Sequence, residues 1–258
     1  MRLKVLACKV LYREISLLSA NSEHTIDTSF LRQGFHDTPQ YLRELLQAEI
    51  NRIDSREDVH SYAPETEEQE FDAILLGYGL CSNAVAGLSS KRYPLVIPRA
   101  HDCAALLIGS KDVYKKIFDE GRGGIYWYSA GWIENAVMPS RDRVERLRAS
   151  YEEAYGEDNA EYLMEMQQNW LKEYKYCMFI DWAGLHNERY IDFTKDCAAY
   201  LDWEYRQIAG DDGLMRDFLS GNWDAERFMV VPPGQKVMQS FDEQIFRAGL
   251  IDEEMAEV

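Results

Sequence analysis

Three of the five cysteines in this 258-residue chain could act together on one chemical group. Cys8, Cys81 and Cys103 each end a stretch that begins as a short apolar run, in the sequences VLAC, ILLGYGLC and VIPRAHDC. Such runs are typical of buried strands, and the carboxyl ends of neighbouring parallel strands meet at the edge of the sheet where ligands bind. If the three strands are neighbours, the three thiols converge. A helix is expected after each cysteine, and the unpaired N–H groups at its start would lower the thiol pKa.

Two kinds of metal centre fit these ligands. Three thiolates with His101, which lies two residues before Cys103, could form a tetrahedral zinc site, or leave one position open for a substrate. Three cysteines on three loops could instead hold three irons of a [4Fe–4S] cluster and leave the fourth iron for chemistry. The alternative is that the thiols only pack at the strand ends, because free cysteine is among the most buried residue types. Cys177 and Cys197 lack this context, and we interpret both as structural.

Two residues beside Cys103 could take part in catalysis. Arg99 could bind a carboxylate or phosphate of a substrate, or it could form a surface ion pair. His101 could activate Cys103 as the nucleophile of a metal-free hydrolase or transferase. That pairing depends on the loop geometry, because side chains two apart share a face on a strand but not on a helix.

The residues around Cys81 predict a close backbone approach. Gly77 and Gly79 resemble the start of a phosphate-binding loop, but the third glycine of that motif is missing. We therefore interpret the two glycines as letting the backbone come near the group that Cys81 binds. Asn83 would supply a polar contact at the same place.

The elements that position these residues alternate between strand and helix patterns. This alternation predicts right-handed crossovers and an α/β fold, a layered α/β/α sandwich with a mostly parallel sheet and room for two Rossmann-like lobes. Thr38 before Pro39 predicts a helix start with Thr38 as the capping residue. The predicted strands are 5–7, 73–76, 95–97, 124–128, 177–180 and 228–231, with weaker candidates at 28–33 and 203–208. One predicted helix starts at Pro39, and four more span residues 141–154, 159–174, 188–201 and 213–219.

A charge-rich segment suggests how the chain is divided. We predict an N-terminal α/β lobe at 1–139 that carries the cysteine site, a helical bridge at 140–175 and a C-terminal α/β lobe at 176–258. One continuous domain is the alternative.

The charge of the chain excludes several classes of function. It carries 45 acidic and 28 basic residues, a net charge of −17, which would repel a nucleic-acid backbone or an anionic membrane. No apolar stretch reaches the roughly 18 residues of a membrane span, and the N-terminus lacks the apolar region of a signal peptide. Five cysteines without a secretion signal argue against a disulfide framework. We expect a cytoplasmic protein.

Four motifs together resemble an uncharacterised domain-of-unknown-function family of anaerobic bacteria and methanogenic archaea. They lie at residues 7–14, 33–39, 75–81 and 98–103. Members of that family are often encoded near corrinoid-dependent methyltransferases, so the resemblance implies a setting in corrinoid-linked one-carbon metabolism. His101 and Cys103 are also similar to the His-x-Cys element of zinc-dependent corrinoid:thiol methyltransferases, in which zinc lowers the pKa of a thiol acceptor.

Two functional hypotheses follow. The first is a metal-binding protein that acts in corrinoid-linked methyl transfer, with Cys8, Cys81, Cys103 and His101 at the centre and a small molecule or a corrinoid protein as its partner. The second is a non-enzymatic accessory protein that binds a corrinoid or a metal and delivers it to a methyltransferase. The negative charge would suit docking on a basic patch of that partner. The sequence leaves open whether the protein is an enzyme and what its oligomeric state is.

Overall fold

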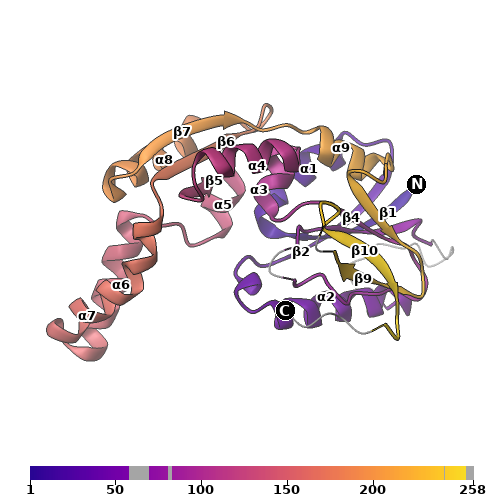
Figure 1. Ribbon diagram of the computed structural model, residues 1–258, viewed down its shortest axis with the longest axis horizontal. Helices are drawn as coiled ribbons and strands as arrows, with labels where there is room; N and C mark the ends of the chain where they lie inside the picture. The colour runs from indigo at the N-terminus through magenta and orange to yellow at the C-terminus, as the bar shows by residue number, and fades with distance from the viewer. Residues whose placement is uncertain (58–69, 81–82, 241, 254–258) are drawn as a thin grey trace. The chain divides into compact units, whose positions relative to one another are not determined.

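The computed structural model describes residues 1–57, 70–80, 83–240 and 242–253, apart from the side chain of His36. It divides into two compact units (Figure 1). Unit 1 consists of Met1–Lys111 and Asp211–Val258, and unit 2 consists of Asp112–Gly210. Each unit contains its own mainly or wholly parallel sheet with helices packed on it, which confirms the predicted α/β class.

The sheet of unit 1 has five strands in the order β2-β1-β3-β4-β8. The first four are parallel, and β8 is antiparallel to β4. The chain goes from β1 to β2 on one side and then crosses to β3 on the other side of β1, so the strand order reverses between β1 and β3. Open α/β sheets bind ligands at such a switch point, beyond the carboxyl ends of the strands. The strands are β1 (Arg2–Cys8), β2 (Thr25–Leu31), β3 (Ala73–Gly77), β4 (Leu95–Pro98) and β8 (Phe228–Val231).

Helices cover both faces of this sheet. Figure 1 shows α2 on one face and α1, α3 and α9 on the other. In α2 the apolar residues at helical spacing, among them Leu42, Leu46 and Ile50, are buried. An antiparallel hairpin of β9 and β10 completes the unit. The elements are η1 (Lys9–Leu11), α1 (Tyr12–Ala20), η2 (Phe35–Asp37), α2 (Pro39–Asp54), α3 (Cys103–Ile108), α9 (Gly213–Ser220), β9 (Gln235–Gln239) and β10 (Phe246–Leu250).

The sheet of unit 2 has three parallel strands in the order β5-β6-β7. Helix α8 packs on the face that carries Tyr128, Cys177 and Phe179. Trp127 is adjacent to Tyr128 on β5, so its side chain lies on the opposite face of the sheet. It stacks against Tyr114 of α4 with ring centroids 5.6 Å apart, so α4 covers that face. The elements are α4 (Lys111–Glu120), β5 (Ile125–Tyr128), α5 (Ala130–Asn135), α6 (Arg141–Tyr155), α7 (Glu157–Gln168), η3 (Asn169–Glu173), β6 (Tyr176–Asp181), α8 (Glu188–Leu201) and β7 (Glu204–Ala209).

The division of the chain differs from the predicted lobes at 1–139 and 176–258. Strand β8 pairs with β4, from Leu95 opposite Val231 to Pro98 opposite Phe228, so the C-terminal part of the chain returns to unit 1. Residues 140–175 do not bridge two lobes, because β5 and β6 on either side of this segment pair directly in one sheet. The structure thus contains one unit inserted into another.

Two smaller predictions are also corrected. Thr38 precedes α2 as expected, with Pro39 in the first turn, but its side chain makes no capping hydrogen bond. The helix expected at 159–174 ends at Gln168, and the chain continues as the 3-10 helix η3. In the described part of the chain, no helix combines the length and the apolar character needed to cross a membrane.

Candidate functional site

The structure brings Cys8 and Cys103 together at the carboxyl edge of the unit 1 sheet. Cys8 is the last residue of β1, and Cys103 is the first residue of α3. Their side chains form a hydrogen bond, and both residues are buried, with 8% and 7% of their surface exposed. The Asp102 carboxylate caps α3 by accepting from the Ala105 N–H at 3.0 Å, which fixes the start of the helix at Cys103.

The environment of Cys8 favours its thiolate. The hydrogen bond from Cys103 is the main cause that lowers the pKa of Cys8, and backbone N–H groups of Val10 and Lys9 add to it. Burial acts in the opposite direction but does not cancel these effects. Because η1 begins directly after Cys8, the unpaired N–H groups of its first turn lie near the sulfur and favour the thiolate. The pair therefore consists of one thiol that donates and one sulfur that is readily ionised.

The loops after β3 and β4 lie against each other. A Cβ atom added to Gly79 would lie 2.6 Å from the backbone nitrogen of Asp102, and one added to Gly77 would lie 2.6 Å from the Cβ of Ala7. The Leu80 N–H also donates to the Ala100 carbonyl at 2.8 Å. The close backbone approach predicted for the two glycines is thus made to the chain itself, beside Cys103. Cys81 lies outside the described residues.

Asn83, two residues after Cys81 in the sequence, has a buried polar atom. Its backbone has a φ of 67°, in the left-handed region, and its carbonyl accepts from Arg43 Nη2 at 2.7 Å. The side-chain oxygen Oδ1 is buried and has no hydrogen-bond partner in the described part of the chain. A buried oxygen of this kind is costly unless a ligand, an ion or water satisfies it.

His101 and Arg99 are placed differently. The side chain of His101 is exposed. Arg99 donates from Nε to the carbonyl of Ala225 at 2.9 Å and from Nη1 to those of Gln244 and Phe246 at 2.5 and 2.6 Å. These bonds tie the end of β4 to the C-terminal segment. They give Arg99 a structural role that neither the substrate-binding nor the surface ion-pair interpretation predicts.

The described residues supply two of the proposed ligands. No three His, Cys, Asp or Glu side chains among them lie close enough to hold a metal ion, and the predicted three-cysteine centre depends on Cys81. The chemistry of Cys8 and Cys103 fits a soft metal, because zinc and iron–sulfur clusters are bound by thiolates. Their position at the switch point fits a ligand site. Cys8 and Cys103 therefore have the chemistry and the position of two ligands of such a group.

The other two cysteines belong to the core of unit 2, the structural role that the sequence predicts. Burial raises the pKa of Cys177 to about 11 and that of Cys197 to about 12. Both hydrogen-bond with the Tyr128 hydroxyl, which itself donates to the Pro139 carbonyl at 3.1 Å. These thiols stay protonated at neutral pH and are poor nucleophiles.

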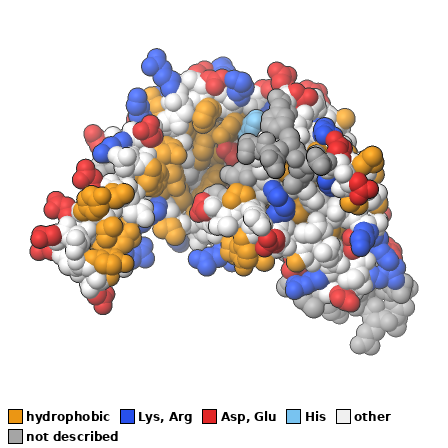
Figure 2. All heavy atoms as spheres, turned by 60° about the horizontal axis from the view of Figure 1, so that its bottom comes forward, with side chains coloured by type: hydrophobic (Ala, Val, Ile, Leu, Met, Phe, Trp, Pro, Cys, Tyr) orange, Lys and Arg blue, Asp and Glu red, His pale blue; other side chains and the backbone are white. Residues whose placement is uncertain are grey.

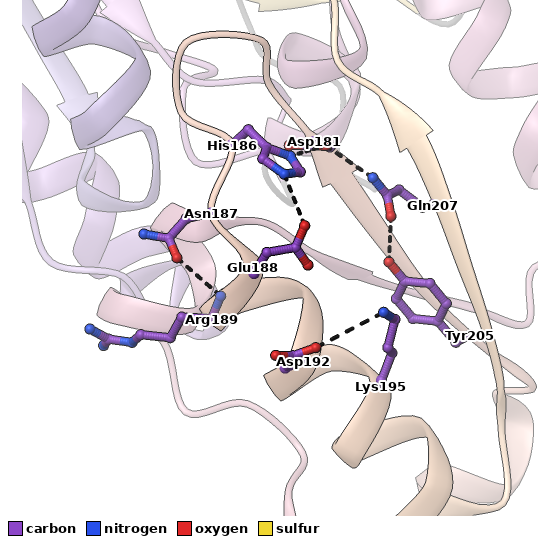
Figure 3. Close-up of polar contacts among 9 residues, drawn as sticks. All are labelled: Asp181, His186, Asn187, Glu188, Arg189, Asp192, Lys195, Tyr205 and Gln207. Atoms are coloured by element: carbon purple, nitrogen blue, oxygen red, sulfur yellow. Dashed lines mark hydrogen bonds and ion pairs between the residues drawn. The ribbon is translucent and has the colours of Figure 1, made fainter.

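The structure also contains a polar network at the carboxyl end of β6 that the sequence did not lead us to expect (Figure 3). His186 Nδ1 lies 2.7 Å from Asp181 Oδ2, and His186 Nε2 lies 3.3 Å from Glu188 Oε1. Gln207 donates to the same Asp181 oxygen at 3.0 Å and accepts from the Tyr205 hydroxyl at 2.6 Å. The two carboxylates, Asp181 first, raise the pKa of His186. The network can hold a proton on the imidazole.

The signal for this network was present in the sequence. Asp181 directly follows the apolar run 177–180, so the same strand-end rule that selected the three cysteines also selects Asp181. His186 lies in the loop that follows, before Asn187 caps α8.

Comparison with known proteins gives one result. The chain matches, over residues 30–219, the family described as "Protein of unknown function (DUF1638)". No curated protein and no solved structure matches the chain. The matched range includes Cys81, His101 and Cys103 and begins after Cys8. Because the match covers well over half of the sequence, the chain belongs to this domain-of-unknown-function family, DUF1638.

Proposed function

We propose that Cys8, Cys81 and Cys103 bind one thiophilic metal centre, a zinc ion or a [4Fe–4S] cluster. The observation that carries this proposal is the contact between Cys8 and Cys103, which come from two strand ends at the switch point of unit 1. Leu80, the residue before Cys81, is hydrogen-bonded to Ala100 in the loop that leads to Cys103. This hydrogen bond holds the loop after β3, as far as Leu80, against the loop that leads to Cys103.

The residues of the chain would have distinct tasks in this centre. The N–H groups of Lys9 and Val10 stabilise the Cys8 thiolate, so less free energy is lost in removing its proton before metal binding. Asp102 holds the start of α3, and with it Cys103. Asn83 Oδ1, a buried acceptor with no partner among the described residues, would accept a hydrogen bond from the bound group or from a water on it. His101 would supply the fourth ligand or act as a neighbouring proton carrier. When bound, zinc would activate a thiol or methyl acceptor, and a cluster would supply redox or Lewis-acid chemistry.

The proposed setting of this centre is corrinoid-linked methyl metabolism in the cytoplasm. It rests on the family resemblance and not on the geometry. In this setting the protein transfers a methyl group between a corrinoid and a thiol, or it delivers metal or corrinoid to a methyltransferase. The net charge of −17 favours a basic partner surface in the second case. Turnover of methylcobalamin with a small thiol would support the enzyme, and its absence together with stoichiometric release of cargo would support the carrier.

The experiment is metal analysis of single variants purified without oxygen. Wild type, Cys8→Ser, Cys81→Ser, Cys103→Ser and His101→Ala are compared with Cys197→Ser, a buried thiol of unit 2, as the matched control. Circular dichroism shows that each variant is folded. Wild type and control should contain about one zinc, or about four iron with broad absorption near 400 nm, per chain.

Each of the three cysteine variants should lose most of this metal while remaining folded, and His101→Ala should keep it if His101 is only a neighbour. Metal retained in all three cysteine variants would contradict the proposal. Wild type without metal, even after refolding with zinc or with iron and sulfide, would also contradict it and would leave Cys8 and Cys103 as a thiol pair.

A further inference from the structure

The helices α6 and α7 have almost no core of their own. The 15-residue α6 buries no side chain, and the 12-residue α7 buries only Ala160 and Met164. We call residues 141–168, which contain both helices, the hairpin. It packs mainly on itself and on η3, and within unit 2 it extends away from the three-stranded sheet (Figure 1). Helices in water obtain most of their stability from the packing of an apolar face, so these two lack a usual source of stability.

Large apolar side chains lie on the surface of the hairpin. Tyr155 is 58% exposed, Tyr162 is 63% exposed and Met166 is 61% exposed. Tyr162 and Met166 are four residues apart on α7 and therefore share one face. Tyr155 lies at the end of α6, with its ring 6.3 Å from that of Tyr151. Figure 2 shows hydrophobic side chains gathered along this part of the molecule. The hairpin thus presents apolar positions to solvent on both helices.

The charges of the hairpin are separated along its length. The first half of α6, at the base of the hairpin, has a net charge of +2, because its four arginines outnumber two carboxylates; these are Arg141, Arg143, Arg146 and Arg148 with Asp142 and Glu145. The end of α6 and the whole of α7 carry acidic residues and no lysine or arginine; these are Glu152, Glu153, Glu157, Asp158, Glu161 and Glu165. The first half of α6 is therefore net basic, and the tip, where α6 ends and α7 begins, is acidic.

We propose that the hairpin binds the hairpin of a second copy of this chain, antiparallel and about a two-fold axis. In this arrangement the acidic tip of each copy lies against the arginines at the base of the other, and both contacts are identical by symmetry. A tip-to-tip arrangement would place like charges together. Four helices packed in this way form a bundle whose centre takes up the exposed tyrosines and methionine. The charge pattern thus selects both the partner and its direction.

The first test removes the apolar contacts. Light scattering after size exclusion, at about 1 to 100 μM, should give wild type a mass approaching twice the 30.0 kDa of the chain. Tyr162→Glu with Met166→Glu should be monomeric at every concentration. Leu250→Glu is the matched control, because Leu250 is 68% exposed but lies in β10. It should leave the dimer intact, and circular dichroism should show that all three proteins are folded.

The second test reverses the charges. Arg146→Glu with Arg148→Glu should weaken the dimer by about tenfold or more, because both ends of the bundle then carry acidic groups. Adding Glu152→Arg, Glu153→Arg, Glu157→Arg and Asp158→Arg to the same chain makes the tip basic and leaves the base acidic, so it should restore the dimer. High salt should weaken the wild-type dimer, since the charges lie at the surface.

Two results would overturn the proposal. A wild-type chain that is monomeric at the highest concentration excludes a second copy as the occupant of the hairpin. A dimer that survives both the Tyr162→Glu/Met166→Glu and the Arg146→Glu/Arg148→Glu variants lies elsewhere on the molecule. Neither result bears on the metal centre, because the three cysteines belong to unit 1.

Discussion

Cys8 and Cys177 are both buried thiols, but their surroundings give them opposite chemistry. Hydrogen bonds from Cys103, Val10 and Lys9 lower the pKa of Cys8, whereas burial raises that of Cys177 to about 11. Because the thiolate is the reactive form, we expect Cys8 of metal-free protein to be alkylated by iodoacetamide at neutral pH much faster than Cys177. Peptide mapping by mass spectrometry at a series of pH values measures both rates.

The cause of this difference can be tested at Cys103. Cys103→Ala removes the main hydrogen bond to Cys8, so the pH at which Cys8 becomes reactive should rise. The reaction of Cys177 should not change, since it lies in unit 2. An unchanged pH profile for Cys8 in Cys103→Ala would show that the two side chains do not interact.

The proton on His186 depends on the carboxylates beside it. Asp181 and Glu188 raise the pKa of His186 above its ordinary value. A raised folded-state pKa means that these ion pairs stabilise the fold fully below about pH 6.5 and that this stabilisation is lost as the pH rises through the folded pKa. We expect Asp181→Asn to lower the pKa of His186 toward the ordinary value, as followed by NMR titration of the imidazole protons. Glu188→Gln should give a smaller change, and equal pKa values in wild type and Asp181→Asn would refute the assignment.

At the scale of elements, the contact between the loops after β3 and β4 positions Cys103. Gly79 has no room for a side chain, because an added Cβ would lie 2.6 Å from the Asp102 nitrogen and 2.8 Å from its Cα. Both atoms belong to the backbone at the start of α3 and cannot rotate away. We expect Gly79→Ala to cost about 1 to 3 kcal/mol in the free energy of unfolding by urea, and to reduce metal binding by moving Cys103.

Gly234→Ala is a useful comparison for this substitution. A Cβ at Gly234 meets nothing within 4 Å, but the residue has a φ of +78°, so the substitution should cost about 1 kcal/mol through the backbone alone. Its metal content should equal that of wild type. Full metal binding by Gly79→Ala as well would show that the approach of the two loops does not position the ligands.

The sequence predicts the individual elements better than their assembly. Apolar runs such as 73–76 and 95–97 correspond to β3 and β4, and α8 covers the predicted residues 188–201, because periodicity is a local property. The contact between Cys8 and Cys103 agrees with the expectation that strand ends meet at one sheet edge. Cys8 ends β1 and Cys103 follows β4, and both strands belong to one parallel arrangement with β3 between them. The carboxyl ends of parallel strands can therefore be inspected for chemistry before the strand order is known.

The features that the sequence could not predict depend on partners far away in the chain. Lys4 lies within β1 with none of its surface exposed, which is tolerable because its Nζ lies 3.1 Å from Asp27 on β2. Arg99 is occupied by carbonyls more than a hundred residues away. The pairing of β8 with β4 likewise joins residues from opposite ends of the chain, and no local pattern distinguishes an antiparallel edge strand from a parallel one.

At the scale of the whole molecule, unit 2 is an insertion that starts and ends at one place in unit 1. The Asp211 N–H donates to the Leu107 carbonyl at 3.1 Å, and an added Cβ at Gly109 would lie 2.8 Å from the Cβ of Asp211. The chain therefore leaves unit 1 and returns to it at adjacent residues. All five strands of the unit 1 sheet and all three cysteines of the proposed centre come from unit 1.

This arrangement predicts that unit 1 folds and binds metal without unit 2. Replacing residues 112–210 by a short glycine–serine linker joins Lys111 to Asp211. Because Gly109, two residues before Lys111, already lies against Asp211, the linker is short and closing it costs little loop entropy. The shortened protein should unfold cooperatively in urea, contain the same metal per chain as wild type and be monomeric, because the hairpin at 141–168 is gone. As a control, the same linker inserted within β3, after Leu75, should abolish folding because it interrupts a central strand of the sheet. A shortened protein that folds but contains no metal would mean that unit 2 contributes to the centre, and one that folds as a dimer would place the subunit contact in unit 1.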